Sequence, residues 1–332
     1  MHSPSSTGRR GALALCAAAA VLATSGWAQT AGDYPSKPVT IVTPFAAGSG
    51  PDAVLRLVAD KLARQWSQRV LIDNKPGGGG FIAIEQARRA APDGYTLLQL
   101  DSEHLAALPH LYKARNFVPL QHFQPVASLF RTPFFVAVQT ESKWQNMADL
   151  IAAAKAQPGR MTYGSWGVGS PGHLGAEELQ GLTGTSMQHV PYREVSQLYS
   201  NVGSGELPWA FASIPSSQGI YKAGKLRYIA VAAPKRVPQM PDVPTMAESG
   251  GPAGLEVNSF VSLVAPVGVS DAVANRINAD VAKAIADPEI RARFDTFAFE
   301  PLAWSPDEIR RQAEIKSKVY GELVRRSNIS LD

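Results

Sequence analysis

Two short segments rich in small residues could bind a small anion. The first is Pro44-Phe45-Ala46-Ala47-Gly48-Ser49-Gly50-Pro51-Asp52, which lies between an expected strand and an expected helix. Small side chains leave backbone N–H groups accessible, and the N-terminus of a helix adds partial positive charge. The segment therefore predicts a cradle for an anion. The alternative is an ordinary strand-to-helix turn in which Asp52 caps the helix.

The segment Gly167-Val168-Gly169-Ser170-Pro171-Gly172-His173 repeats this arrangement after a strand expected to end near Ser165. Ser170 can cap the following helix and still offer its hydroxyl group. Two such cradles, each at the carboxyl end of a strand, could face each other across one cleft. That arrangement suits a small molecule with two anionic ends.

Other chemistries have weaker support. The pattern Gly48-x-Gly50-x-x-Ala53, with Asp73 ending the next expected strand, matches a relaxed dinucleotide fingerprint, as does Gly167-x-Gly169-x-x-Gly172. An exported dinucleotide-dependent oxidoreductase is therefore an alternative, although the residues before Gly48 lengthen the turn beyond that fingerprint. No Gly-Lys-Ser/Thr follows Gly77–Gly80, no Gly-x-Ser-x-Gly occurs, and no two histidines after residue 28 have metal-ligand spacing. We expect no enzyme activity, no cofactor and no metal site.

Alternating strands and helices must position these segments. The first series predicts a parallel sheet with right-handed crossovers. Its elements are strands at 38–44, 70–73 and 95–100 and helices at 52–66 and 81–91. A second series continues with strands at 134–138, 161–165, 187–190, 208–212 and 226–232 and helices at 146–156, from 172, and near 194–202. A strand at 259–265 and terminal helices follow, the last opening with the capping box Ser305-Pro306-Asp307-Glu308.

The order of these elements predicts an α/β protein with two lobes, each a mainly parallel sheet flanked by helices. We place residues 29–132 and 258–332 in lobe 1 and residues 133–257 in lobe 2. The chain then crosses between the lobes twice, near residues 132 and 257. Two links of this kind make a hinge with a ligand cleft between the lobes.

The first 28 residues have the pattern of an export signal. Arg9 and Arg10 precede the apolar run Leu13–Leu22, which is too short to span a bilayer, and Gly26-Trp27-Ala28 supplies the small residues that a signal peptidase needs. We expect cleavage after about Ala28 and a periplasmic location, by either the Sec or the twin-arginine route. Cys16 is the only cysteine and lies in this segment, so the mature chain has no thiol chemistry.

Composition excludes several classes of protein. The chain has 332 residues, of which 45% are hydrophobic and 18% charged, and its length suits two domains. Without Arg9 and Arg10, 30 Lys and Arg residues face 28 Asp and Glu residues. A net charge this small does not steer a polyanion, so we expect no nucleic-acid partner. No later apolar run approaches the ~18 residues of a membrane span.

The ordered motifs of the chain resemble those of the tripartite tricarboxylate transporter substrate-binding proteins, also called Bug proteins. The motifs are YPSKPVTIVTPFAAGSGPD, NKPGGGGF, APDGYTLL, YGSWGVGSPGHL, HVPY, AGKLRYIAV and PDVPTMAESG. The resemblance covers residues 34 to about 325. It implies a type II Venus-flytrap fold and a monomer in the periplasm. It also implies capture of a small carboxylate, and delivery of it to a membrane permease of two other subunits without catalysis.

In that family, loops like Phe45–Asp52 and Ser165–His173 hold one carboxylate of the ligand. The resemblance therefore implies ligand contacts for Phe45, Ala47, Ser49, Gly169 and Ser170. We also expect ligand contacts for Asp52, Ser165, Trp166, His104 and Tyr192. Some family members bind a ligand amino group at the position of Asp52. In a protein that binds only carboxylates, Asp52 would instead be a cap.

Four residues depart from the common family pattern. Ser49 replaces a usual Gly, Val168 replaces a polar residue, and Ala212 replaces an Asp. Trp166 replaces a small residue and adds a large flat face. Together they favour a flat or elongated ligand, such as the aromatic dicarboxylate terephthalate, over citrate. The alternative for Trp166 is packing within the lobe, and the alternative for the whole protein is a sensor subunit that presents its ligand to a receptor kinase.

Overall fold

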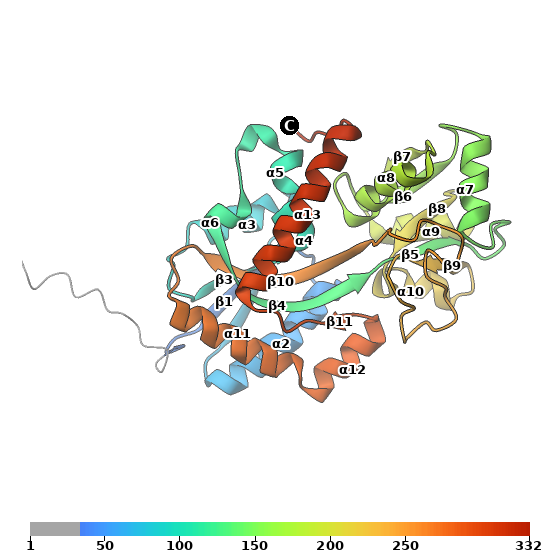
Figure 1. Ribbon diagram of the computed structural model, residues 1–332. Coiled ribbons are helices and arrows are strands. Elements are labelled where there is room, and N and C mark those ends of the chain that lie inside the picture. Colours follow the sequence, from blue (N-terminus) through green and yellow to red (C-terminus); the bar gives the residue numbers. More distant parts are fainter. Residues whose placement is uncertain (1–33) are drawn as a thin grey trace, which may run out of the picture. The chain divides into compact units, whose positions relative to one another are not determined.

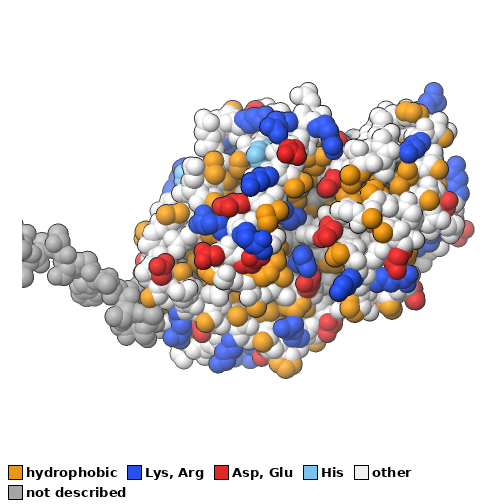
Figure 2. All heavy atoms as spheres, viewed as in Figure 1, with side chains coloured by type: hydrophobic (Ala, Val, Ile, Leu, Met, Phe, Trp, Pro, Cys, Tyr) orange, Lys and Arg blue, Asp and Glu red, His pale blue; other side chains and the backbone are white. Residues whose placement is uncertain are grey.

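A computed structural model describes residues 34–332, of which 35–332 form one compact unit. The expected export signal, with its cleavage after Ala28, lies outside the described residues. The described residues form two β-sheets with helices around each (Figure 1). Positive and negative side chains are interspersed on the face that Figure 2 shows.

The first sheet has the strand order β11-β4-β10-β3-β1-β2. Its strands are β1 (Val39–Thr43), β2 (Val70–Asn74), β3 (Thr96–Asp101), β4 (Phe123–Pro133), β10 (Asn258–Pro266) and β11 (Glu300–Pro301). The predicted parallel arrangement of the first three strands is confirmed, because β1 pairs in parallel with both β2 and β3. β10 runs antiparallel to β3 and β4, so the sheet is mixed rather than mainly parallel.

Helices α2 (Gly50–Trp66), α3 (Phe81–Arg88), α11 (Asp271–Ile285), α12 (Pro288–Phe297) and α13 (Pro306–Arg326) accompany this sheet. Between β3 and β4 the chain forms the short helices α4 (Ser102–Ala106), α5 (Leu108–Leu111) and α6 (Pro119–His122). Two 3-10 turns are η2 (Gly78–Gly80) and η3 (Lys113–Arg115). The predicted cap of the last helix is confirmed, since the Ser305 hydroxyl accepts a hydrogen bond from the Glu308 amide at 3.2 Å.

The second sheet has the order β7-β6-β8-β5-β9. Its strands are β5 (Phe135–Gln139), β6 (Thr162–Ser165), β7 (Gln188–Pro191), β8 (Trp209–Ala212) and β9 (Leu226–Val231), and its helices are α7 (Met147–Ala156), α8 (Pro171–Thr183), α9 (Val195–Ser204) and α10 (Ile214–Lys222). β6 is parallel to β7 and β8, whereas β5 is antiparallel to β8 and β9. This sheet is also mixed, contrary to the expectation of mainly parallel strands.

Alternate residues of β5 enter two apolar cores on opposite faces of the second sheet. Val136 and Val138 belong to one core, and Phe135 and Ala137 belong to the other. A strand buried on both faces reads as a continuous apolar run, which explains why the sequence identifies β5.

Two segments connect the sheets, and they are hydrogen-bonded to each other. β4 ends at Pro133 and β5 begins at Phe135, while β10 begins at Asn258 directly after Val257. The Phe134 amide donates to the Val257 carbonyl at 3.0 Å, and the Val257 amide donates to the Ala232 carbonyl at 2.9 Å. In Figure 1, β4 and β10 run side by side up to this point, as their pairing requires.

Candidate functional site

A cavity of about 510 Å³ has walls from both sheets and the loops around them. Of the residues predicted to contact a ligand, Phe45, Ser49 and Trp166 line it. Other lining residues that bear on its chemistry are Asp101, Phe134, Ser213, Ser259, Phe297 and Phe299. We call this the first cavity. Its walls combine aromatic rings with a few hydroxyl groups, which is typical of sites for small ligands.

Strand register explains the part of the wall that the first sheet contributes. Asp101 on β3 lies opposite Val261 on β10, and Ser259 on β10 lies opposite Thr132 on β4. Because side chains alternate along a strand, these four share one face of the sheet. All four line the first cavity.

The loop between β1 and α2 supplies hydrogen-bond donors to this region. The Phe45 amide is bound to the Thr43 hydroxyl at 3.2 Å, whereas the amides of Ala47 and Gly50 have no acceptor among the described residues. The Ser49 hydroxyl is buried and also has no partner within residues 34–332. Buried polar groups normally have partners, so these donors are consistent with a site that a ligand completes.

Asp52 supports this loop from outside the cavity. It lies in the first turn of α2, whose N-cap is Ser49, so the alternative in which Asp52 is the cap is wrong. Its buried carboxylate accepts hydrogen bonds from the Gly48 amide at 2.8 Å, from Arg56 at 2.9 Å and from Asn74 at 2.8 Å. Burial opposes ionisation, but these hydrogen bonds hold the pKa of Asp52 below its usual value of 3.8.

The second predicted cradle satisfies its own donors. The amides of Gly167, Gly169 and Ser170 donate to the Ser165 hydroxyl, to His173 Nδ1 and to the Gly167 carbonyl. Ser170 caps α8, as predicted, because its hydroxyl accepts from the His173 amide and donates to the Gly167 carbonyl. The expectation of bare N–H groups is wrong at these three positions, because the tight turn provides acceptors within itself.

Several predicted contact residues lie away from the first cavity. Gly169 packs so closely on Leu111 that an added Cβ would lie 2.3 Å from its side chain. Ser165 is fully buried and its hydroxyl is 2.7 Å from His189 Nε2. Tyr192 accepts a hydrogen bond from Asn201 at 3.0 Å. The residues outside the cavity lining are Ala47, Asp52, Ser165, Gly169, Ser170, His104 and Tyr192.

Trp166 both packs within the structure and lines the first cavity. Its ring lies 5.2 Å from the Phe134 ring, at an interplanar angle of 31°. An added Cβ at Gly172 would lie 2.8 Å from the indole, so this glycine makes room for Trp166 on α8. The indole also contacts the apolar cores on both faces of the second sheet.

Sequence reasoning missed much of the cavity wall. Phe297 and Phe299 come from the end of α12 and the segment after it, far along the chain from either loop. Nothing in their local sequence indicates where they pack. Asp101 could have been found, since it is an acidic residue at the carboxyl end of a predicted strand next to β1.

Asp101 belongs to a cluster of ionisable groups, and the other members of the cluster do not line the first cavity. Asp101 Oδ1 accepts from the His104 amide at 2.9 Å and from His104 Nδ1 at 2.5 Å. Burial works against the charge of both groups, but their mutual attraction lowers the pKa of Asp101 and raises that of His104. Next to them, burial raises the pKa of Glu103 and lowers that of Lys316, which lies 3.8 Å away from it.

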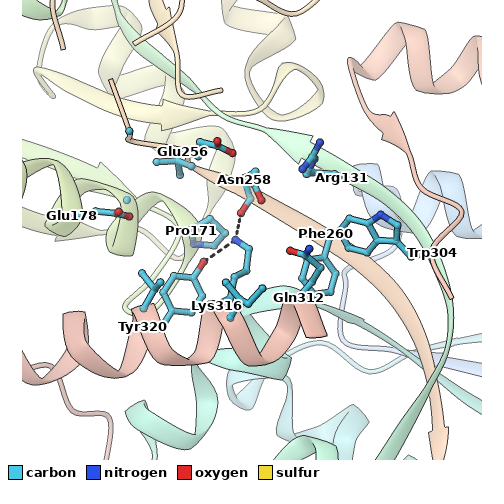
Figure 3. Close-up of a pocket in the computed structure, with 15 residues that line it drawn as sticks. Arg131, Pro171, Glu178, Glu256, Asn258, Phe260, Trp304, Gln312, Lys316 and Tyr320 are labelled. Carbon is cyan, nitrogen blue, oxygen red and sulfur yellow. Dashed lines mark hydrogen bonds between the residues drawn. The ribbon is translucent and has the colours of Figure 1, made fainter. Parts of the chain in front are cut away.

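A second cavity of about 410 Å³ lies on the other face of β4 and β10 (Figure 3). Arg131, Asn258 and Phe260 line it, whereas their neighbours Thr132, Ser259 and Val261 line the first cavity. Lys316 on α13 donates to the Asn258 carbonyl at 2.7 Å and to the Tyr320 hydroxyl at 3.2 Å. Neither predicted cradle lines this cavity beyond Pro171, so the first cavity is the better candidate for the ligand site.

Within residues 34–332, no three His, Cys, Asp or Glu side chains lie close enough together to hold a metal ion. The same part of the chain contains no helix that is both long enough and apolar enough to cross a membrane.

Comparison with known proteins gives consistent matches over nearly the whole chain. A family model described as "Tripartite tricarboxylate transporter family receptor" matches residues 54–329. A UPF0065 protein from the tcbD-tcbE intergenic region of Pseudomonas sp. (strain P51) is 32% identical over 317 residues, covering 96% of this chain and 94% of the relative.

Solved structures with the same architecture include Rpa4515 of R. palustris with adipate, at a TM-score of 0.81 and 29% identity, covering 90% of this chain and 100% of that one. The periplasmic binding protein BugD matches with a TM-score of 0.76 and 27% identity, and the match covers 89% of this chain and 99% of that one. MatC from Rhodopseudomonas palustris with bound malate matches with a TM-score of 0.76 and 25% identity, and the match covers 88% of this chain and 100% of that one. These similarities confirm the predicted two-lobed α/β fold.

Proposed function

Because this chain belongs to the tripartite tricarboxylate transporter family of receptors, we propose that it captures a small carboxylate in the first cavity and delivers it to a membrane permease of two other subunits. Two similar structures hold the carboxylates adipate and malate. We propose that the protein is exported to the periplasm after removal of its first 28 residues and acts there as a monomer.

The observation that carries the proposal is the set of free donors beside the first cavity. The Gly50 amide and the buried Ser49 hydroxyl line this cavity and lack partners among the described residues. Each can donate to a carboxylate oxygen, and hydrogen bonds to charged groups are worth about 1.5–3 kcal/mol each. A micromolar dissociation constant corresponds to about −8 kcal/mol, so a few such bonds plus apolar burial account for it after ordering costs.

The walls favour a ligand with a flat apolar body. Phe45, Phe134, Trp166, Phe297 and Phe299 all line the first cavity. Aromatic rings pack on one another in offset or edge-on geometry with an extra gain of about 0.5–1.5 kcal/mol. We therefore propose an aromatic carboxylate, and the dicarboxylate terephthalate is one candidate to be tested.

The function proposed is capture and release without catalysis. Family membership removes the support for the dinucleotide-dependent oxidoreductase, because the family consists of solute receptors. Asp73, which the fingerprint would assign to a ribose, instead binds Gln86 and Lys75.

A thermal-shift screen of aliphatic and aromatic mono- and dicarboxylates tests the binding step. We expect the melting temperature to rise with at least one aromatic member, by mass action equivalent to about 2.7 kcal/mol at a hundredfold excess over the dissociation constant. Ser49→Ala should weaken that ligand by about tenfold or more, because it removes one hydrogen bond to a charged group. A panel with no shift for any carboxylate would contradict the proposal.

The delivery step needs a separate test. Deleting the gene should abolish cellular uptake of the ligand identified in the screen, and restoring the wild-type gene should recover it. If uptake persists and only the transcriptional response to the ligand is lost, the sensor alternative is supported instead.

A further inference from the structure

We propose that Asp101 makes the first cavity select carboxylates that also carry an amino group over dicarboxylates and simple monocarboxylates. The inference rests on the proposed function and narrows its ligand from aromatic carboxylates in general to those with a cationic or hydrogen-bond-donating substituent. Neither predicted cradle contains this residue.

Asp101 is fixed at the cavity wall by its place in the fold. It is the last residue of β3 and the N-cap of α4, where its side chain accepts a hydrogen bond from the His104 amide. Its register opposite Val261 turns it to the same face as Ser259 and Thr132. The Asp101 side chain is about 15% exposed and lines the cavity, so a ligand there can reach it.

Asp101 is the one residue with a full charge among the described residues that line the first cavity. An ionised carboxylate only accepts hydrogen bonds, so a second ligand carboxylate beside Asp101 would find no donor there, while an ammonium group can donate to it. The second carboxylate would also meet a like charge, which His104 offsets only in part because His104 lies outside the cavity lining. The cavity offers no Lys or Arg side chain among those described lining residues to offset that repulsion.

The neighbouring charges leave Asp101 available to a ligand. His104 holds only Oδ1, through its amide and its ring, and His104 does not line the first cavity. Glu103 cannot take the same role, because its carboxylate accepts hydrogen bonds from Ser102, Ser259 and Tyr320. The ion pair with His104 also keeps the pKa of Asp101 low, so the carboxylate is ionised at neutral pH.

The loop donors lie on the neighbouring strand connection. β1 and β3 are adjacent and parallel, so the Phe45–Gly50 segment and Asp101 follow the carboxyl ends of neighbouring strands. The Phe45 ring contacts the His104 ring edge-on at 5.9 Å between centroids, which brings the two segments together. A carboxylate on the loop amides and an amino group on Asp101 therefore describe one molecule with both groups.

Isothermal titration with two matched ligand pairs and terephthalate tests the inference. The first pair is phenylalanine and 3-phenylpropionate, and the second is 4-(aminomethyl)benzoate and 4-methylbenzoate. The two members of each pair differ only in the amino group. This group is next to the carboxylate in phenylalanine and across the ring from it in 4-(aminomethyl)benzoate. We expect the wild-type protein to prefer the amino member of at least one pair by about tenfold or more, and to bind terephthalate more weakly than that member.

Asp101→Asn should reduce this preference by about tenfold or more, because it removes the charge while keeping an oxygen that can cap α4. Asp73→Asn is the matched control, since Asp73 also lies near the end of a strand but does not line the first cavity. It should leave the preference unchanged. A circular dichroism melt of each variant verifies folding, and the preference of the wild-type protein is decisive by itself.

The inference is overturned if terephthalate or the amino-free members bind the wild-type protein as tightly as both amino members. It is also overturned if Asp101→Asn, correctly folded, keeps the full preference. If none of the five compounds binds, both the amino group and the aromatic body are wrong. The wider carboxylate screen then shows whether the proposed function stands without them.

Discussion

Asp52 shapes the first loop without touching the cavity. Its carboxylate joins the Gly48 amide, Arg56 and Asn74 in one buried hydrogen-bonded group. Asp52→Ala removes the shared acceptor, and we expect a loss of about 1.5–3 kcal/mol in the free energy of unfolding measured with urea. Asp60→Ala is the control, because Asp60 lies on the same helix but is exposed. A loss no larger than that of the control would contradict this role.

The same residue predicts how stability depends on pH. The pKa of Asp52 is lower in the folded protein than its ordinary value of 3.8. Its contribution is therefore complete above pH 3.8 and is lost as the pH falls through the folded value. The difference in unfolding free energy between wild type and Asp52→Ala should be constant from pH 7 to 5 and shrink below about 4. If the difference in unfolding free energy instead grows as the pH falls, the pKa of Asp52 is raised and not lowered by folding.

Trp166 is the residue through which we expect the cavity to recognise an aromatic ring. Trp166→Ala should weaken terephthalate or a related aromatic carboxylate by roughly tenfold, since one aromatic contact is worth about 0.5–1.5 kcal/mol and about 1.4 kcal/mol is one decade. Adipate, which lacks a ring, should lose less. Titration calorimetry of both ligands against both proteins measures the difference. Equal losses would mean that Trp166 only supports Phe134 and Gly172.

At the scale of elements, α8 is positioned by a glycine that faces one of the two connecting segments. A Cβ at Gly175 would lie 2.6 Å from the Val257 side chain, which is buried. Gly175→Ala should cost about 1–3 kcal/mol in the free energy of unfolding, because it overpacks this contact. The matched control is Gly219→Ala on α10, where nothing lies within 4 Å of the added methyl group.

That control should be neutral or stabilising by up to about 1 kcal/mol, because alanine has the higher helix propensity. Urea denaturation of both variants gives the comparison. Similar effects at the two positions would show that helix propensity, and not the contact with Val257, sets the cost at Gly175.

Local patterns predicted the elements that have strong signals of their own. β1, α2, β2 and the strands of the second sheet follow apolar runs and helical stripes, and Ser170 and Ser305 follow cap patterns. The sequence does not identify β4, because Pro125 lies within it and Pro133 ends it, although β10 and β11 pair with it on either side. The mixed character of the sheets depends on long-range pairing that no local pattern specifies.

The candidate site was predictable only in part, for the same reason. Phe45, Ser49 and Trp166 lie in loops whose small residues mark them, and they line the first cavity. Gly169 and Ser170 also lie in a loop of small residues, but they do not line the first cavity. Gly169 packs against Leu111, and the Ser170 hydroxyl donates to the Gly167 carbonyl within the turn. Composition shows that a backbone donor can be free, whereas tertiary packing decides whether it is.

At the scale of the whole molecule, an apolar cluster joins elements that accompany different sheets. Leu174 on α8 packs with Leu111 on α5 and with Tyr320 and Leu323 on α13. Lys316 on the same helix holds the Asn258 carbonyl, where the chain enters β10. Lys316 and Tyr320 also line the second cavity, so any hinge motion has to accommodate contacts at the wall of that cavity.

Two connecting segments between two sheets predict a hinge that closes on the ligand. Hinge closure requires a few backbone torsions to change where the segments cross, here near residues 133–134 and 257. Donors from the first loop and rings from the second sheet can contact one ligand together only when both walls are near it. Binding therefore favours the closed arrangement by the difference in affinity between the two states.

Small-angle X-ray scattering should show a smaller radius of gyration with a saturating ligand from the carboxylate screen than without it. The starting sample must be unfolded, dialysed and refolded, so that no ligand carried through purification masks the change. A non-binding carboxylate at the same concentration controls for the effect of salt on the scattering. An unchanged radius, in a sample that titration shows to be fully bound, would mean that the two sheets form a rigid body and that the ligand enters a preformed cavity.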